Sequence, residues 1–233
     1  MTIGEHLGEL RRRLVVAVGA FVVLACVSIF LYKWEFSLLQ HPYCQIAGTR
    51  GCSFYVTAPL DVLSLRVKLA AFGGAVLASP IVLWEVWRFI TPGLRSSEKR
   101  YAVPFIVASI TLFLSGCAIV YVVLPHTLGW LIHIGGPKIH ALLNPNTYLT
   151  LVLLLMVLFG VTFEFPVVLV ALQLARVVSP RSLLRHWRWW VIGITVASAV
   201  FTPSSDPFSM IALAVPLTFF YFASIGVGKL CHR

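Results

Sequence analysis

The sequence is poor in charged residues, and this scarcity bears first on the fold class. Only 11% of its 233 residues are charged, whereas 59% are hydrophobic. A soluble domain carries roughly a quarter charged residues. The apolar residues gather in runs of about 20, the length of helix that crosses a ~30 Å hydrocarbon core. We therefore predict an all-α integral membrane protein, with a single membrane domain over residues 1–233.

The sequence also lacks the short motifs of common enzymes. It contains no HExxH, no GxSxG and no P-loop. Its seven histidines form no close pair at helical spacing inside an apolar run, so we expect no metal site and no cofactor. An intramembrane protease would need a catalytic pair that is missing here. These absences predict a protein that is not an enzyme.

The net charge of +10 raises nucleic-acid binding as an alternative, but the placement of the charges argues against it. The basic residues cluster at alternate ends of apolar runs, which is the orientation bias of a multispanning protein. After an amphipathic lead-in over residues 1–13, we expect six transmembrane helices. Their predicted bounds are about 14–32, 62–84, 101–124, 148–174, 189–201 and 208–228.

The distribution of lysine and arginine sets the predicted orientation. Five of the 18 basic residues fall on one side of the membrane, namely Lys33, Arg50, Arg66, Lys68 and Lys138. The other thirteen fall on the side of the N-terminus, so both termini are predicted to be cytoplasmic. The start of the chain is similar to a signal peptide, but its apolar run is too long for one, so we expect it to be retained. The fifth apolar run is short, ~20 Å as helix.

The stretch Trp84–Arg100 is unusual for a loop between membrane helices. It places Glu85 and Glu98 among four basic residues and beside aromatic residues. The predicted orientation puts it in the same compartment as Glu9. These carboxylates either neutralise neighbouring arginines or bind a cationic ligand, and arginine suits such a site because its guanidinium pairs bidentately with carboxylate. Glu85 is either a third contact or a neutraliser of Arg88.

Glu164 lies well inside the fourth apolar run. A charge at the bilayer centre costs ~2.5–3.5 kcal/mol on insertion scales, so such residues tend to face protein or water and to be functional. The alternative is a structural carboxyl bonded to a neighbouring helix. A proton-coupled secondary transporter using Glu164 is a rival function, but it predicts inverted repeats that the sequence does not display.

Two cysteines, Cys44 and Cys52, fall in the polar segment between the first two predicted helices. On the outer side of the membrane they would meet an oxidising compartment, which favours a disulfide over two reduced thiols. Cys26 and Cys117 lie inside apolar runs and are expected to be small core residues.

Four motifs, in order along the chain, carry a family resemblance. They are HLGELRRRL at 6–14, SP at 79–80 leading through FITPGL at 89–94 to EKR at 98–100, FGVTFEFP at 159–166, and TP at 202–203 with DP at 206–207. Together they resemble TatC, the core membrane subunit of the twin-arginine protein translocase. The resemblance covers essentially the whole chain.

The resemblance implies a fold and a function. The six helices would form a curved, cupped arrangement in the bacterial cytoplasmic membrane, with helices 5 and 6 too short to span fully. The protein would bind the paired arginines of signal peptides on folded cargo. It would act with TatA- and TatB-type single-span subunits, as a homo-oligomer within the complex, and would be driven by the proton motive force.

The resemblance also assigns roles to residues. Glu9 and Glu98 would contact the two signal arginines, and Glu164 would be an intramembrane carboxylate on the concave face. Asp206 would belong to a functional outer turn. Signal recognition or complex assembly would be supported by Phe89, Arg11, Arg13 and Pro42. Glu85 departs from the family pattern, because a neutral glutamine is common at this position in relatives.

Overall fold

The computed structural model describes residues 3–47, 54–56, 58–90, 102–134, 144–202 and 206–231. Within these ranges the chain is helical and forms no strand. The helices are α1 (Ile3–Ala47), α2 (Pro59–Ile90), α3 (Ala102–Ile134), α4 (Pro145–Thr162), α5 (Phe165–Leu174), α6 (Pro180–Arg185), α7 (Trp187–Phe201) and α8 (Pro207–Cys231). The all-α prediction is confirmed.

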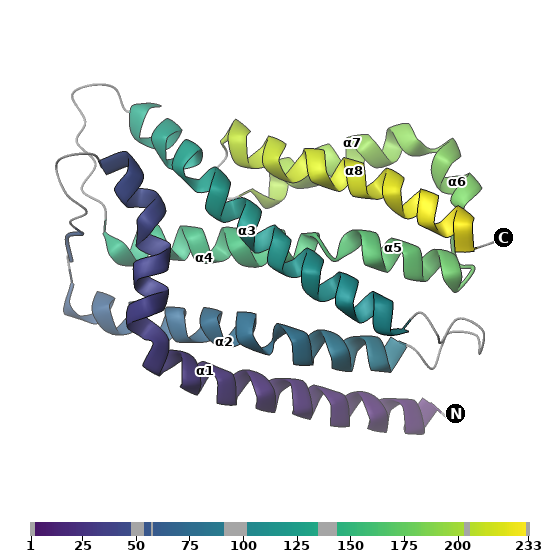
Figure 1. The fold of residues 1–233 in the computed structure, drawn as a ribbon, viewed down its shortest axis with the longest axis horizontal. Helices are drawn as coiled ribbons and strands as arrows, with labels where there is room; N and C mark the ends of the chain where they lie inside the picture. Colours follow the sequence, from purple (N-terminus) through teal and green to yellow (C-terminus); the bar gives the residue numbers. More distant parts are fainter. Residues whose placement is uncertain are drawn as a thin grey trace.

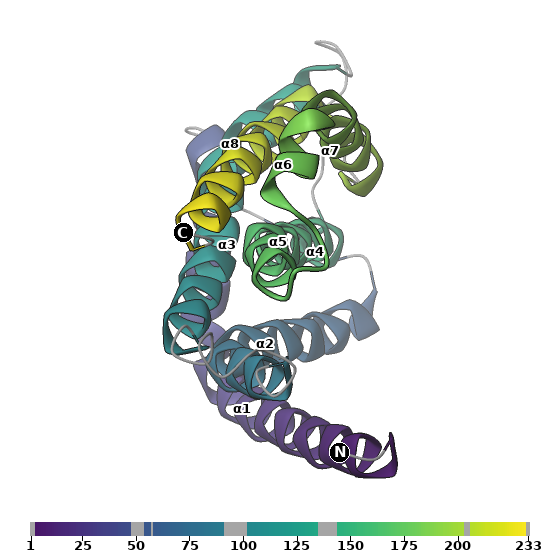
Figure 2. The same ribbon diagram turned by 90° about the vertical axis from the view of Figure 1, so that its right-hand side faces the viewer.

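The helices form an arc (Figures 1 and 2). It runs from α1 through α2 and α3 to α8, and α4 and α5 lie on its hollow side (Figure 2). The curved, cupped arrangement expected from the resemblance is therefore confirmed. Figure 1 places both ends of the chain at the same end of the array, where α2 ends and α3 begins. We call this the terminal end and the opposite one the far end.

Most of the helices are long enough to cross a membrane. Five described segments qualify by length and composition: 7–46, 59–90, 103–131, 145–174 and 207–230. The fifth apolar element in chain order, α7, has 15 residues, or ~22 Å at 1.5 Å per residue. The short fifth helix is thus present as predicted. The expectation of a short sixth helix is wrong, because α8 continues through Pro216 for 25 residues.

Helix α1 is longer than its predicted span of 14–32. It runs without a break from Ile3 to Ala47, so residues 33–47, predicted as loop, are helical. The polar residues and Pro42 suggested a loop, but Leu39 and Tyr43 are buried and hold this segment against the core.

Proline inside these helices is compensated by side chains. Pro42 has no N–H to donate to the carbonyl of Leu38, and the Tyr121 hydroxyl on α3 donates to that carbonyl instead, at 3.2 Å. Pro80 likewise frees the carbonyl of Val76, which accepts from the Ser79 hydroxyl at 2.7 Å. Such compensation is what allows proline inside membrane helices.

The predicted fourth helix is divided into α4 and α5. Both fall within one apolar segment, 145–174. The break lies at Phe163 and Glu164, just before Pro166. Proline cannot donate the hydrogen bond that would continue α4, so the ladder is interrupted there. This local effect places Glu164 at a joint between two helices.

Glycines allow neighbouring helices to approach closely. A Cβ atom on Gly74 of α2 would lie 2.5 Å from the Cα of Ala25 on α1. A Cβ on Gly116 of α3 would lie 2.7 Å from the carbonyl oxygen of Phe159 on α4. Small residues at helix contacts are typical of membrane proteins, where close backbone approach supplies much of the attraction.

Candidate functional site: a guanidinium between two carboxylates

At the terminal end, Arg13 lies between carboxylates of two helices. Its Nη1 donates to Glu85 Oε2 on α2 at 3.1 Å. Its Nε donates to Glu9 Oε1 on α1 at 3.2 Å, and its Nη2 forms a second, shorter contact with the same oxygen. Sequence reasoning left the role of Glu85 open, and the structure pairs it with Arg13.

The helices themselves place these groups. Glu9 and Arg13 are one turn apart on α1, the spacing at which side chains share a face. Glu85 reaches them from the last turns of α2, which packs alongside α1 (Figure 1). The side chains of Arg13, Glu9 and Glu85 remain 14%, 25% and 15% exposed. The cluster is therefore partly open to solvent.

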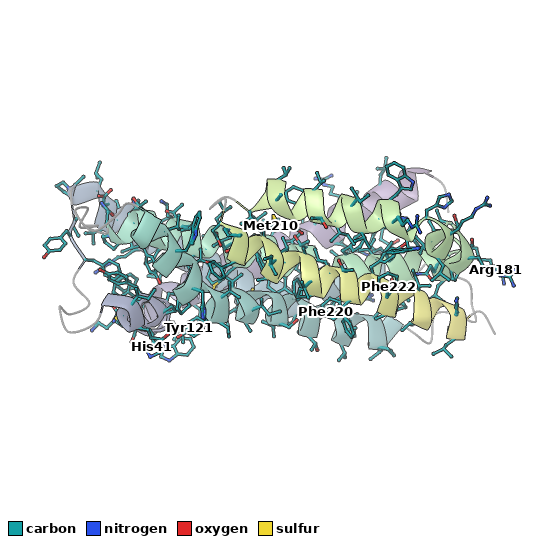
Figure 3. All side chains as sticks on the ribbon, turned by 90° about the horizontal axis from the view of Figure 1, so that it is seen from above. His41, Tyr121, Arg181, Met210, Phe220 and Phe222 are labelled. Atoms are coloured by element: carbon teal, nitrogen blue, oxygen red, sulfur yellow. The ribbon has the colours of Figure 1, made fainter. Side chains whose placement is uncertain are left out.

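Further basic residues lie at the same end of the molecule, although α6, which carries Arg181, is on the opposite limb of the arc from α1 (Figure 2). Arg11 and Arg12 are exposed on α1, and Arg181 lies at the terminal end of the molecule, away from His41 and Tyr121 (Figure 3). Glu98, predicted to be the partner of Glu9, lies outside the described residues. Its segment connects Ile90 at the end of α2 to Ala102 at the start of α3.

The aromatic residues near Glu85 divide into two kinds. Trp84 is exposed, and Phe89 is half-buried. Trp87 is buried and stacks on Phe105 of α3 with ring centroids 4.9 Å apart. Its Nε1 donates to the Ser109 hydroxyl at 2.7 Å. Trp87 therefore ties α2 to α3 rather than belonging to an exposed aromatic surface.

Glu164 has features of both roles that the sequence left open, a structural carboxyl and a functional one. It forms a side-chain hydrogen bond with Ser109 of the neighbouring helix α3. Its Oε1 atom is buried and has no hydrogen-bond partner among the described residues. Ser109 thus links Trp87 on α2 to Glu164 at the α4–α5 joint, and an acceptor atom of the carboxyl is left over.

Two predicted site residues lie far from Glu9. Pro42 is buried near the end of α1, where Tyr148 donates its hydroxyl hydrogen to the carbonyl of Leu39 at 2.8 Å. Asp206 is also buried and caps α8, accepting from the backbone N–H of Ser209 at 2.7 Å. Thr127 of α3 donates to the same carboxyl at 3.3 Å. The structure does not bring either residue to the Glu9 cluster.

A polar network at the far end was missed by sequence reasoning. Asp61 accepts from the side-chain amides of Asn144 at 2.9 Å and Asn146 at 3.3 Å. Lys68 donates to Asn146 Oδ1 at 2.8 Å and to Thr150 Oγ1 at 2.7 Å. No local sequence pattern links Asp61 to Asn144 and Asn146, which lie more than 80 positions away in the chain.

A second buried carboxyl, Glu35, was also missed. The prediction that α1 ended near residue 32 placed it in an outer loop, whereas it lies inside α1 and is 9% exposed. Cys44 is disulfide-bonded. Its predicted partner Cys52 lies outside the described residues, so that pairing stays a prediction. Cys26 and Cys117 are free thiols; Cys117 is buried as predicted, whereas Cys26 is exposed on α1, so its predicted place in the core is wrong.

Fold and site together define a class: a multispanning helical membrane protein in which two carboxylates, Glu9 and Glu85, hold Arg13 at the end that contains both termini. The family profile described as "TatC: Sec-independent protein translocase protein (TatC)" matches residues 5–216. The chain belongs to the TatC family and is a multi-pass membrane protein of that translocase.

Relatives and solved structures agree with this assignment. The TatC protein of Frankia casuarinae is 35% identical over 100% of this chain and 67% of its own length. The TatC protein of Aquifex aeolicus is 34% identical over 100% of this chain and 97% of its own. A crystal structure of a twin-arginine translocase receptor TatC superposes with a TM-score of 0.79 at 34% identity, covering 98% of this chain and 100% of the other. The family is a translocase component rather than a known enzyme, and the match does not favour the secondary transporter.

Proposed function

We propose that this chain is the receptor and core subunit of a twin-arginine translocase. The cluster at the terminal end faces the cytoplasm and binds the paired arginines of signal peptides on folded cargo. Both termini lie on that side of the bacterial cytoplasmic membrane. TatA- and TatB-type single-span subunits join the chain, itself present in several copies, for export driven by the proton motive force.

The observation that carries this proposal is the guanidinium already bound by Glu9 and Glu85. Arg13 donates to both carboxylates from one planar group. Charge-assisted bonds of this kind are about twice as strong as neutral ones and select for guanidinium geometry. A site that holds the chain's own arginine has the chemistry needed to hold a ligand's arginine.

The remaining predicted residues take supporting roles. Glu98 supplies the second signal-binding carboxylate, and Phe89 packs beside the bound arginines. Arg11 and Arg13 hold the carboxylates in place before the signal arrives. Pro42 and Asp206 support the complex by shaping the far end, and Glu164 meets the apolar part of the signal or a partner helix.

Binding of a labelled twin-arginine peptide to the purified protein tests this function. Hydrogen bonds to charged groups contribute about 1.5–3 kcal/mol, so Glu98→Gln or Glu9→Gln is expected to weaken binding about tenfold or more. A peptide with two lysines in place of the arginines is the matched control and should bind weakly to every variant. Unchanged binding in both single variants and in the double variant would show that the site is wrongly assigned.

A further inference from the structure

Glu35 is a buried carboxyl that the receptor function does not use. The Ser28 hydroxyl donates to its Oε1 at 2.6 Å, whereas its Oε2 has no hydrogen-bond partner among the described residues. Gly73 of α2 makes room for it, because a Cβ atom there would lie 2.2 Å from Glu35 Oε1. The α1–α2 contact thus accommodates a carboxyl group of which the described residues bond one oxygen and not the other.

The carboxyl of Glu35, with one oxygen bonded and one not, differs from a nearby polar group on the same helix. Less than two turns farther along α1, the carbonyl freed by Pro42 receives a hydrogen bond from Tyr121. In the hydrocarbon layer no water is at hand to satisfy a leftover polar atom, and each such atom costs free energy. An acceptor atom left open at Glu35 therefore points to a donor from outside the chain.

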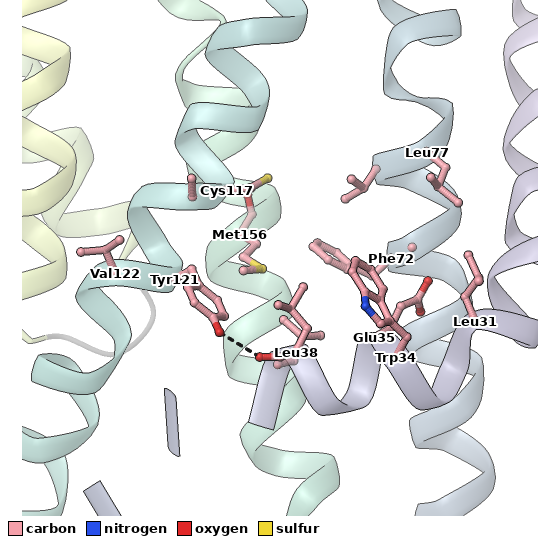
Figure 4. A pocket seen from close by; sticks show the side chains of 14 residues that line it. Leu31, Trp34, Glu35, Leu38, Phe72, Leu77, Cys117, Tyr121, Val122 and Met156 are labelled. Atoms are coloured by element: carbon pink, nitrogen blue, oxygen red, sulfur yellow. Dashed lines mark hydrogen bonds between the residues drawn. The ribbon is translucent and has the colours of Figure 1, made fainter. Parts of the chain in front are cut away.

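Glu35 lines a cavity of about 450 Å³ between α1, α2, α3 and α4 (Figure 4). Gly73, Cys117 and Met156 also line it, and each lies near the middle of its apolar segment. The cavity is therefore close to mid-depth in the membrane. Its rim is apolar and open to the outside, with five large exposed side chains: Leu31, Trp34, Leu38, Leu77 and Val122.

Three occupants could fill such a groove in a bilayer. A lipid acyl chain fits the apolar rim but brings no hydrogen-bond donor. Besides Glu35, the lining carries the hydroxyl of Tyr121, the thiol of Cys117 and the indole N–H of Trp34, and the first two already donate to backbone carbonyls. A water molecule needs two to four polar partners, so this lining suits it poorly. A transmembrane helix supplies both an apolar face for the rim and, from one polar side chain, a donor for the carboxyl. Polar side chains join membrane helices in this way.

We propose that this groove docks a transmembrane helix of another subunit, which donates a hydrogen bond to Glu35 from a polar side chain within its apolar stretch. The exposed rim residues pack against the apolar face of that helix. Trp34, 66% exposed and adjacent to Glu35 in the chain, is the most exposed of these rim residues on α1. The proposal is independent of arginine recognition, because neither Glu9 nor Glu85 takes part.

A defined peptide tests the proposal without a signal peptide. The full chain is reconstituted in phosphatidylcholine vesicles with a synthetic single-span Leu/Ala helix that carries one central glutamine. A photo-crosslinking amino acid replaces Leu77 on the rim. The matched peptide has leucine in place of the glutamine. The matched position is Val215, which is 62% exposed on α8 and does not line the groove.

We expect the glutamine peptide to crosslink at Leu77 about 3- to 15-fold more than the leucine peptide, the range of measured hydrogen bonds between membrane helices. At Val215 the two peptides should crosslink equally. Glu35→Leu should bring the ratio at Leu77 to about one, and Glu35→Gln should keep most of it. Retained binding of a twin-arginine peptide shows that both variants are folded.

Three results would overturn the proposal. The first is equal crosslinking of the two peptides to the chain with Glu35 intact. The second is that position 77 crosslinks to lipid alone. The third is that position 77 crosslinks to a second copy of the chain, and that excess peptide does not displace this copy. The first comparison uses the chain with Glu35 intact, so it decides even if Glu35→Leu fails to fold. A failure here with normal twin-arginine peptide binding would leave the receptor function standing.

Discussion

The two ends of the helix array hold their carboxylates in different ways. At the far end, Asp206 and Asp61 accept hydrogen bonds from hydroxyl, amide and backbone groups that come from more than one helix. At the terminal end, Glu9 and Glu85 share the single guanidinium of Arg13. Neutral donors that belong to helix ends are held in place by those helices. A partly exposed guanidinium, by contrast, can be replaced by the guanidinium of another arginine. The far end thus holds its carboxylates through several neutral donors, and the terminal end through one partly exposed guanidinium.

The strongest test of this difference between the two ends is to remove the carboxyl of Asp206, which is buried at the start of α8. Asp206→Ala deletes the cap of α8 and leaves Thr127 and the Ser209 N–H without this acceptor. A lost cap costs about 1 kcal/mol and an unsatisfied buried group about 1–3 kcal/mol. We expect a loss of about 3 kcal/mol, measured as a lower midpoint of unfolding in detergent.

Asp206→Asn is the control for that change, because its amide oxygen can still accept the Ser209 N–H. It should recover more than half of the lost stability. Twin-arginine peptide binding at low temperature should stay close to that of the native chain in both variants. An unfolding midpoint of Asp206→Ala equal to that of the native chain would remove the structural role assigned to the cap.

A smaller effect is expected at the second far-end carboxyl. Asp61→Ala removes the acceptor of the Asn144 and Asn146 side chains and so loosens α2 from α4. Asp61 is half-buried and the freed amides can reach water, so we expect a loss of about 1–2 kcal/mol. Lys68→Met in the same assay tests the neighbouring pair. A double variant that loses no more than the larger single variant would show that the two pairs act as one network.

The sequence was sufficient for the class of fold, because apolar runs and basic flanks are local signals. The sequence was not sufficient where the local structure depends on a residue that is far away in the chain. Residues 33–47 read as loop because they contain polar residues and Pro42, yet Tyr121 and Tyr148 supply the bonds that keep them helical. Glu35 was not identified as a buried carboxyl because it falls in that segment. A carboxyl group in a loop is expected to be in contact with water.

The candidate site was predictable in part for the same reason. Glu9 and Arg13 are one turn apart and could be paired from the sequence. The contact between Arg13 and Glu85 joins residues 72 positions apart and depends on how α1 packs against α2. Asp206 was singled out by its motif, but its partner Thr127 on α3 has no local signal. Pairs within one helix turn were visible, and pairs across helices were not.

The smallest effect on stability should come from Glu85→Gln at the terminal end. Partly exposed ion pairs contribute about 0–1 kcal/mol, so the unfolding midpoint should barely move. Binding of the twin-arginine peptide should nevertheless fall about threefold, because Arg13 then depends on Glu9 and competes with the ligand for it. This difference should shrink as salt is raised, since screening weakens exposed charge pairs. A loss of stability as large as that of Asp61→Ala, with peptide binding unchanged, would mean that the terminal end is built like the far end.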